Sequence, residues 1–333
     1  MYDPNGIGLP NGNFFGFPYS IEESDLILLS VPWDVTTSCR RGAALAPKAI
    51  LNASLQLDFF DFDVPEAWLK KIATEPINPQ ITAANTTYRA VSEHVIHQLE
   101  SWLQPEPDDL SKVNNACEVV NNYVFKTCQN YLQQGKTIGL VGGDHSTPLG
   151  LIQALCEVHD HFGILHLDAH ADLREAYEGF TYSHASIMHN VLLLKNVQTL
   201  VQVGLRDVSP NEMHRIENDD RIVCFSDYAL KNGTFTGYSW QEQCQTIIQA
   251  LPEKVYISFD IDALSPENCP HTGTPVPGGL SFYEAVFLLN TLKKNGKTII
   301  GFDLCEVAPT PNDEWDANVG ARILYKLAVQ TLS

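Results

Sequence analysis

The chain has 333 residues, 44% of them hydrophobic, and a formal net charge of −19 at pH 7. This length provides enough apolar side chains for a large buried core, in one or two domains. The acidic balance argues against nucleic acid as a partner, because phosphate backbones are bound by clustered basic residues, and it is compatible with a small cationic substrate. Since no apolar run of about 18 residues occurs, we expect no membrane span, and the opening residues show no signal-peptide pattern.

The eight cysteines are scattered along the chain, and no two of them form a Cys-x-x-Cys pair. A disulfide framework is typical of small secreted chains, whereas scattered thiols are typical of proteins from a reducing compartment. We therefore expect a cytoplasmic protein whose cysteines are free thiols.

Apolar stretches that suit strands alternate along the chain with stretches of helical periodicity. The first strand is expected at 25–31, followed by a loop at 33–41 and a helix that begins near Ala46. Such alternation is typical of a doubly wound sheet. We predict an α/β protein with three layers, α/β/α, and a mainly parallel central sheet.

We expect a single domain over residues 1–333, because α/β proteins of this length often form one. Residues 60–115 are predicted to decorate that domain. Residues 102–113 of this segment are expected to form an exposed polar connector. Helical periodicity follows over 113–134.

Two segments at the ends of apolar runs carry side chains that bind metals, Asp-Ala-His-Ala-Asp and Ser-Phe-Asp-Ile-Asp-Ala. Residues two apart in a strand point the same way, so Asp168 and His170 form one pair and Asp260 and Asp262 another. Carboxylate and imidazole ligands together suit Mn, Fe, Ni or Zn. With Asp172, the four carboxylates carry too much charge for one ion, so the pattern predicts a binuclear metal site at the carboxyl ends of the strands.

A third segment, Gly-Gly-Asp-His-Ser at 142–146, follows another apolar run and places His145 at the exit of a strand. Its two glycines permit a tight path of the backbone. Parallel strands bring their carboxyl ends to one edge of a sheet, so we expect the three segments to converge there. His166 lies within a predicted strand, and we expect it to be buried and hydrogen-bonded.

Five motifs, in this order and spacing over roughly residues 25 to 330, resemble the ureohydrolase family, which includes arginases and agmatinases. They are Gly-Gly-Asp-His-Ser at 142–146, Asp-Ala-His-Ala-Asp at 168–172, Ser-Phe-Asp-Ile-Asp-Ala at 258–263, Thr-Gly-Thr-Pro at 272–275 and Gly-Phe-Asp-Leu-Cys-Glu-Val at 301–307.

The resemblance implies two divalent metal ions per chain. In this family they are usually manganese, with nickel or another ion in some members. It also implies a homo-oligomer, since members are commonly trimers or hexamers. It assigns one ion to His145, Asp168, Asp172 and Asp260, and the second to His170, Asp168, Asp260 and Asp262.

The expected chemistry is hydrolysis of a linear guanidino compound to urea and an amine. A guanidinium carbon is a poor electrophile because its charge is delocalised, so attack requires a strong nucleophile. A hydroxide that bridges two metal ions is such a nucleophile at neutral pH. Glu306 follows an apolar run at 298–302 and matches the family glutamate that pairs with the guanidinium. His184 matches the histidine that shuttles protons, a role that suits imidazole.

Agmatine, which would yield putrescine, is the leading substrate. The stretch 168–186 is similar to agmatinases and lacks the segment with which arginases grip the amino-acid end of arginine. The stretch 204–208 is closer to arginases, but Ser209 stands where an acid commonly binds the α-amino group. Substrate contacts are expected from Asp207 and Thr274, together with Glu306.

Other substrates of the same site stay open, because pocket loops decide among them. They are arginine, guanidinobutyrate, guanidinopropionate, guanidine and formiminoglutamate. Two other classes are a metal-dependent deacetylase and a non-catalytic regulatory relative. The second ligand set and Glu306 argue against the deacetylase, since known deacetylases of this fold use one zinc ion. A non-catalytic relative would be expected to lack a metal ligand, and none of the expected ligands is missing here. The loops expected to shape the pocket are 33–41, 174–186, 206–213 and 264–280.

Overall fold

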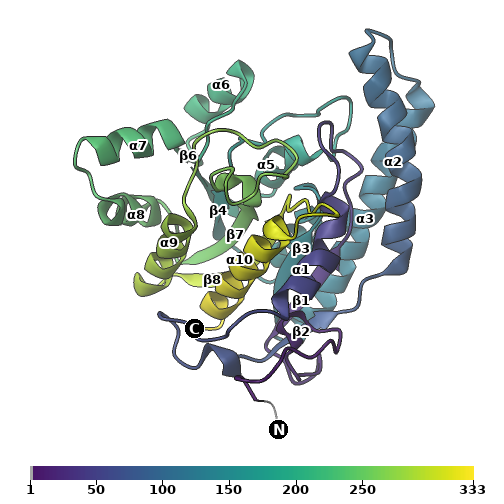
Figure 1. The fold of residues 1–333 in the computed structure, drawn as a ribbon. Coiled ribbons are helices and arrows are strands. Elements are labelled where there is room, and N and C mark those ends of the chain that lie inside the picture. The colour runs from purple at the N-terminus through teal and green to yellow at the C-terminus, as the bar shows by residue number, and fades with distance from the viewer. Residues whose placement is uncertain (1–2) are drawn as a thin grey trace.

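A computed structural model describes residues 3–333, whose centre is an eight-stranded sheet in which every neighbouring pair is parallel (Figure 1). The order of strands is β2-β1-β3-β8-β7-β4-β5-β6. The predicted α/β fold with a parallel central sheet is thereby confirmed. The strands are β1 Leu26–Val31, β2 Ile72–Glu75, β3 Thr137–Gly142, β4 Phe162–Leu167, β5 Val197–Val203, β6 Ile222–Phe225, β7 Lys254–Asp260 and β8 Thr298–Cys305.

Helices cover both faces of the sheet, and the strands explain why. Side chains alternate between the faces, so that Leu26 and Leu28 belong to one buried cluster and Ile27 and Leu29 to the other. The first cluster packs against α1 and α7–α10, and the second against α2–α6. The helices are α1 Ala46–Ser54, α2 Pro79–Glu100, α3 Pro107–Gln133, α4 Leu149–Cys156, α5 Ile187–Leu192, α6 Pro210–Asn218, α7 Asp227–Phe235, α8 Trp240–Gln249, α9 Phe282–Lys294 and α10 Trp315–Thr331.

The order of the strands determines where a site can form. Strands β3 and β4 follow each other in the chain, yet β8 and β7 lie between them in the sheet. The loops that leave these four central strands therefore share one edge of the sheet. Ligands of open α/β sheets bind at such an edge, beyond the carboxyl ends of the strands.

The long helices α2 and α3 lie side by side at one flank of the molecule (Figure 1). Helix α3 begins at Pro107 rather than at Val113, so the polar connector expected over 102–113 is shorter than predicted. Proline suits the first turn of a helix, and Asp108 and Asp109 there favour the positive end of the helix dipole. The expected decorating segment, 60–115, contains the edge strand β2 and all of α2; a single domain stays a prediction.

Within residues 3–333, no helix combines the length and apolar character needed to cross a membrane.

Candidate metal centre and substrate pocket

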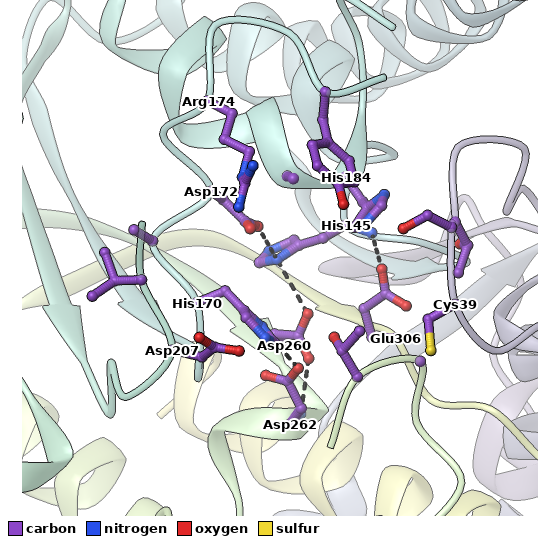
Figure 2. Close-up of a pocket in the computed structure, with 18 of the residues that line it drawn as sticks. Cys39, His145, His170, Asp172, Arg174, His184, Asp207, Asp260, Asp262 and Glu306 are labelled. Atoms are coloured by element: carbon purple, nitrogen blue, oxygen red, sulfur yellow. Dashed lines mark hydrogen bonds and ion pairs between the residues drawn. The ribbon is translucent and has the colours of Figure 1, made fainter. Parts of the chain in front are cut away.

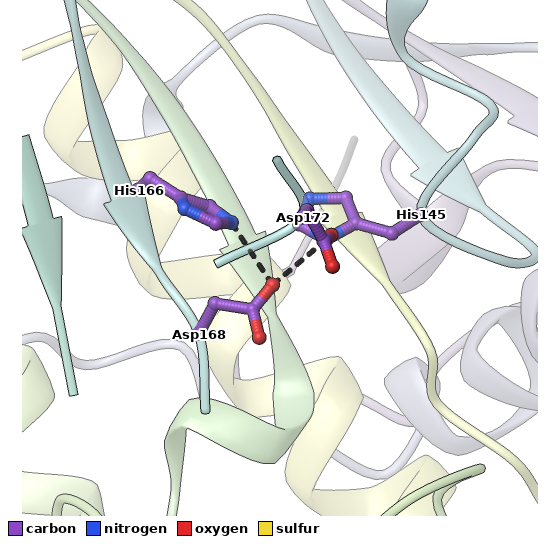
Figure 3. Close-up of side chains that lie close together, drawn as sticks. All are labelled: His145, His166, Asp168 and Asp172. Atoms are coloured by element: carbon purple, nitrogen blue, oxygen red, sulfur yellow. Dashed lines mark hydrogen bonds and ion pairs between the residues drawn. The ribbon is translucent and has the colours of Figure 1, made fainter. Parts of the chain in front are cut away.

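The segments predicted to bind metal meet at the carboxyl edge of the central strands (Figure 2). The Nδ1 atom of His145 lies 3.0 Å from Oδ2 of Asp168, 3.1 Å from Oδ2 of Asp172 and 3.4 Å from Oδ2 of Asp260. All four side chains are buried. Figure 3 shows His145, Asp168 and Asp172 facing one another.

A second group lies next to the first and shares Asp168 with it. The Nδ1 atom of His170 is 3.3 Å from Oδ1 of Asp168 and 3.1 Å from Oδ2 of Asp262. The carboxylate of Asp260 also accepts a hydrogen bond of 2.8 Å from the backbone N–H of Asp262, which fixes the turn after β7. The six residues predicted as ligands thus form two adjoining groups joined by a carboxylate.

The residues fit a pair of divalent cations, because the cluster concentrates buried negative charge. Burial, and then the nearby Asp262 and Asp168, raise the pKa of the Asp260 carboxyl well above its usual range. Burial and Asp168 raise the pKa of Asp172 to about 6. Burial lowers the pKa of the His145 imidazole, but its hydrogen bonds to Asp168, Asp172 and Asp260 outweigh burial and raise it overall. Imidazole nitrogens and carboxylate oxygens that share one buried space are the donor set of a transition-metal site.

The backbone around the cluster is specialised. A Cβ atom on Gly143 would lie 1.7 Å from the carbonyl oxygen of Trp33, so only glycine permits this approach of the loop after β3 to the end of β1. Asp172 and Glu306 both adopt left-handed backbone conformations, with φ of 55° and 62°. Such conformations are uncommon for residues other than glycine and concentrate at functional sites.

Polar side chains beneath the cluster hold its histidines and carboxylates. Nε2 of His166 lies 2.9 Å from Oδ2 of Asp168, which confirms that His166 is buried and hydrogen-bonded. Nε2 of His145 lies 2.9 Å from Oγ of Ser258 and 3.7 Å from Asp303. Sequence reasoning missed Asp303, although a carboxylate within an apolar strand is itself a signal of a buried polar role.

A pocket opens above the cluster, and its walls come mainly from the loops expected to shape it (Figure 2). The predicted substrate residues Asp207 and Thr274 line it, as do His184 and Glu306. Ser209, which stands where relatives commonly have an acid, also lines the pocket. The remaining lining residues outside the metal cluster were not expected individually, and they are Thr37, Ser38, Cys39, Ala171, Arg174, Tyr177, Ala185, Val208, Glu212 and Gly273.

Glu306 is a buried carboxylate at the floor of this pocket. Its Oε1 atom accepts a hydrogen bond of 2.9 Å from the backbone N–H of His145. The backbone N–H of Glu306 donates a hydrogen bond to the carbonyl oxygen of Gly143, and its own carbonyl oxygen accepts one from the hydroxyl of Thr272. Burial, and then the nearby Asp144, raise the pKa of the Glu306 carboxyl well above its usual range. A cation that entered the pocket would therefore stabilise the charged form of this carboxylate and lower its pKa.

His184 lies half-buried in the pocket wall, and Thr36 fixes its position. The hydroxyl oxygen of Thr36 accepts a hydrogen bond of 3.1 Å from the His184 backbone N–H and donates one of 2.9 Å to Asp144. Burial and the neighbouring His170 and His145 lower the pKa of His184 to about 4. Its imidazole is therefore neutral at neutral pH, with one of its ring nitrogens unprotonated.

The outer wall of the pocket carries two acidic side chains, one exposed and one buried. The carboxylate of Asp207 is exposed, and among the described residues it has no hydrogen-bond or ion-pair partner. Glu212 is buried, where its Oε2 atom accepts a hydrogen bond of 2.6 Å from Ser209 and its Oε1 atom one of 3.1 Å from the Leu173 backbone. Ser209 caps helix α6, because its hydroxyl oxygen accepts a hydrogen bond from the Glu212 backbone N–H and the Glu212 carboxylate accepts one from the Ser209 backbone N–H. Of the two acids, Asp207 is the one available to a ligand.

Comparison with known proteins places this geometry in a family. A sequence model of the arginase family matches residues 24–329, so the chain belongs to that family. The family resemblance predicted from the sequence is thereby confirmed.

Relatives with assigned activities share most of the chain. The chain is 32% identical over 309 residues to N(1)-aminopropylagmatine ureohydrolase of Thermus thermophilus, covering 92% of this chain and 90% of the relative. It is 28% identical over 316 residues to agmatinase of Blochmanniella floridana, covering 89% and 87%. In three dimensions it is similar to agmatine ureohydrolase of Thermoplasma volcanium, with a TM-score of 0.72 at 21% identity, covering 97% and 95%. This last likeness shows the fold.

Proposed function

We propose that this protein is a hydrolase of the C–N bonds of linear guanidino compounds, with agmatine as its leading substrate and urea and putrescine as products. The observation that carries the proposal is that two adjoining His/Asp groups share a pocket with the buried carboxylate of Glu306. One part of the pocket suits metal ions and another suits a guanidinium. Membership of the arginase family supports the same conclusion.

We assign the ions to the residues predicted from the sequence. His145 and Asp172 would hold one ion and His170 and Asp262 the other, with Asp168 and Asp260 shared between them. When bound, two divalent ions lower the pKa of water so that hydroxide is available near neutral pH. Manganese is the proposed metal, with nickel as the alternative.

The remaining residues bind the substrate and handle its proton. Glu306 lies where it can accept hydrogen bonds from a guanidinium, which stays protonated at neutral pH. The neutral imidazole of His184 can take up a proton and return it to the departing amine. The free carboxylate of Asp207 can pair with a cationic amine at the distal end of agmatine, and Thr274 adds a hydroxyl to the same pocket.

A second candidate substrate is N1-aminopropylagmatine, which carries a longer cationic tail. The relative that is 32% identical bears that activity in its name. The exposed position of Asp207 in the pocket wall is compatible with a tail that continues toward solvent. A longer tail would add apolar contact and one further charge without any change in the chemistry at the metal ions.

Urea release is the test of this proposal. The manganese-loaded and nickel-loaded protein would be assayed on agmatine, N1-aminopropylagmatine, arginine, guanidinobutyrate, guanidinopropionate and guanidine. We expect the highest kcat/KM with agmatine, and a higher value for N1-aminopropylagmatine would establish the second candidate. Preference for arginine or an acidic compound would overturn the substrate, and no urea from any compound with two ions bound would overturn the reaction.

We also propose that the protein acts in the cytoplasm and forms a homo-oligomer, a trimer or hexamer, as the resemblance to its family implies. Its cysteines are free thiols in the structure, which is compatible with a reducing compartment. Sedimentation of the purified protein would test the oligomer.

A further inference from the structure

The segment 34–39, which we call the pocket loop, links the substrate pocket to helix α2. Thr37, Ser38 and Cys39 line the pocket. Thr36 holds the backbone of His184 and the carboxylate of Asp144. The conformation of the pocket loop therefore determines both the shape of one wall and the position of the histidine proposed to move protons.

One side chain of α2, Arg89, holds most of this loop. Its Nη1 atom lies 2.5 Å from the carbonyl oxygen of Thr37, 2.7 Å from that of Asp34 and 3.4 Å from that of Val35. Its Nε atom donates to Glu93, 3.0 Å away on the next turn of the helix. Only 11% of the Arg89 side chain is exposed. A planar guanidinium has several donors in fixed directions, which suits it to gather carbonyls that point to one place.

Two further contacts of α2 act on the same loop. Asn85 exchanges hydrogen bonds with Asp34, accepting one of 2.8 Å from its backbone N–H and donating one of 3.1 Å to its carboxylate. Glu93 forms an ion pair of 2.5 Å with Arg41, just beyond the loop. Arg41 is largely exposed, so this pair stabilises little by itself. The donors of Arg89 are thus the central attachment, and Asn85 is the secondary one.

We propose that Arg89 is a positioning residue for the reaction, acting through the pocket loop without touching the substrate. This inference rests on the function proposed above. Without the guanidinium, three carbonyls of the loop lose their donor, and the loop is expected to move away from the pocket. The substrate would then bind more weakly through residues 37–39, and turnover would fall through Thr36 and His184. The metal ligands belong to other segments and would keep their ions.

The experiment compares Arg89→Ala and Arg89→Lys with a matched control, Arg221→Ala. Arg221 likewise donates to a backbone carbonyl, that of Leu192 at 2.9 Å, and pairs with an acid, Asp219, but it lies outside the pocket lining. Each variant would be measured for hydrogen exchange of the peptide 34–41, for bound metal, and for KM and kcat separately.

For Arg89→Ala we expect backbone exchange in 34–41 to become about tenfold faster, with unchanged metal content. KM should rise about tenfold and kcat fall by a smaller factor, whereas Arg221→Ala changes none of these quantities. Lysine keeps the charge but is a compact point donor, so Arg89→Lys should lie between the alanine variant and the natural protein.

Unchanged exchange in both Arg89 variants, or exchange that rises equally in Arg221→Ala, would overturn the proposal. If Arg89→Ala does not fold, Asn85→Ala decides: it should loosen the same peptide by a smaller factor, and an unchanged peptide would contradict the attachment of the loop to α2. Failure of the natural protein to release urea would overturn the proposed function and with it the role of Arg89 in the reaction. Hydrogen exchange would still test separately, without any substrate, whether Arg89 holds the pocket loop.

Discussion

The two walls of the pocket are built in different ways. The wall proposed to bind the ions, which we call the metal wall, consists of side chains at the ends of the central strands, such as Asp168 after β4 and Asp260 at the end of β7, and it is nearly closed to solvent. The substrate wall consists of loops, with exposed side chains such as Asp207 and Arg174. The sheet thus positions the residues proposed to carry out the chemistry, whereas loops held by helices position those proposed to select the substrate. Substitutions in the first wall should abolish the reaction, and those in the second should shift its preference.

Asp260→Ala should have the largest effect, because it removes a carboxylate that both ions are proposed to share. We expect loss of bound metal and of urea release. Added manganese should raise the unfolding midpoint of the natural protein only. Two retained ions with full activity would contradict the assignment.

Glu306→Gln should lower kcat/KM at least about 10²-fold, by analogy with the loss of a charge-assisted contact in a dry site. The amide keeps the shape of the side chain but loses the charge proposed to pair with the guanidinium. Metal content should stay near that of the natural protein, which separates this effect from that of Asp260→Ala. An unchanged rate would remove Glu306 from the catalytic site.

Asp207→Asn should have an intermediate effect that depends on the substrate. We expect KM for agmatine to rise about tenfold, the scale of one charge-assisted contact. Guanidine has no distal amine, so if the protein hydrolyses it, KM for guanidine should not change in Asp207→Asn. A loss of equal size for substrates with and without a cationic tail would show that Asp207 does not select the tail.

Glu178→Gln should have the smallest effect, and it should appear only in stability. Glu178 follows the pocket residue Tyr177, and one of its carboxylate oxygens is buried with no hydrogen-bond partner among residues 3–333. Burial and then Glu100 raise its pKa from 4.5 to about 7. The folded protein therefore binds this proton more tightly than the unfolded chain, so stability falls as pH rises from about 4.5 to about 7.

Glutamine cannot ionise, so the Glu178→Gln variant should not show this fall in stability with rising pH. The thermal midpoint of Glu178→Gln should exceed that of the natural protein by a few degrees at most at pH 8, and the two should coincide below about pH 4.5. Equal midpoints at pH 8 would show that this carboxyl does not titrate with a raised pKa in the folded protein.

The metal wall could be predicted from the sequence because strands impose a simple rule. Apolar runs identify β4 and β7, and a period of two aligns Asp168 with His170 and Asp260 with Asp262. The parallel sheet then brings these ends together. Beneath that wall, Asp303 was missed because its neighbour His145 is distant in the sequence, and only the register of β8 against β3, which pairs Asp303 with Leu140, brings them within reach.

The substrate wall could be predicted only as a set of loops. No local pattern indicates that Arg89, in the middle of α2, reaches carbonyl groups some fifty residues earlier in the chain. The same limit applies to the start of α3, where acidic residues typical of a connector instead favour the first turn of a helix. Contacts between elements that are remote in sequence depend on tertiary packing, which periodicity does not encode.

The central claim is that two metal ions in one pocket hydrolyse a guanidino compound. The most direct test is to titrate the metal-free protein with manganese and to measure bound ions and urea release from agmatine at each step. The account predicts that activity rises with the second ion and reaches its maximum at two ions per chain. Full activity with one ion bound, or two bound ions without urea from any guanidino compound, would contradict it.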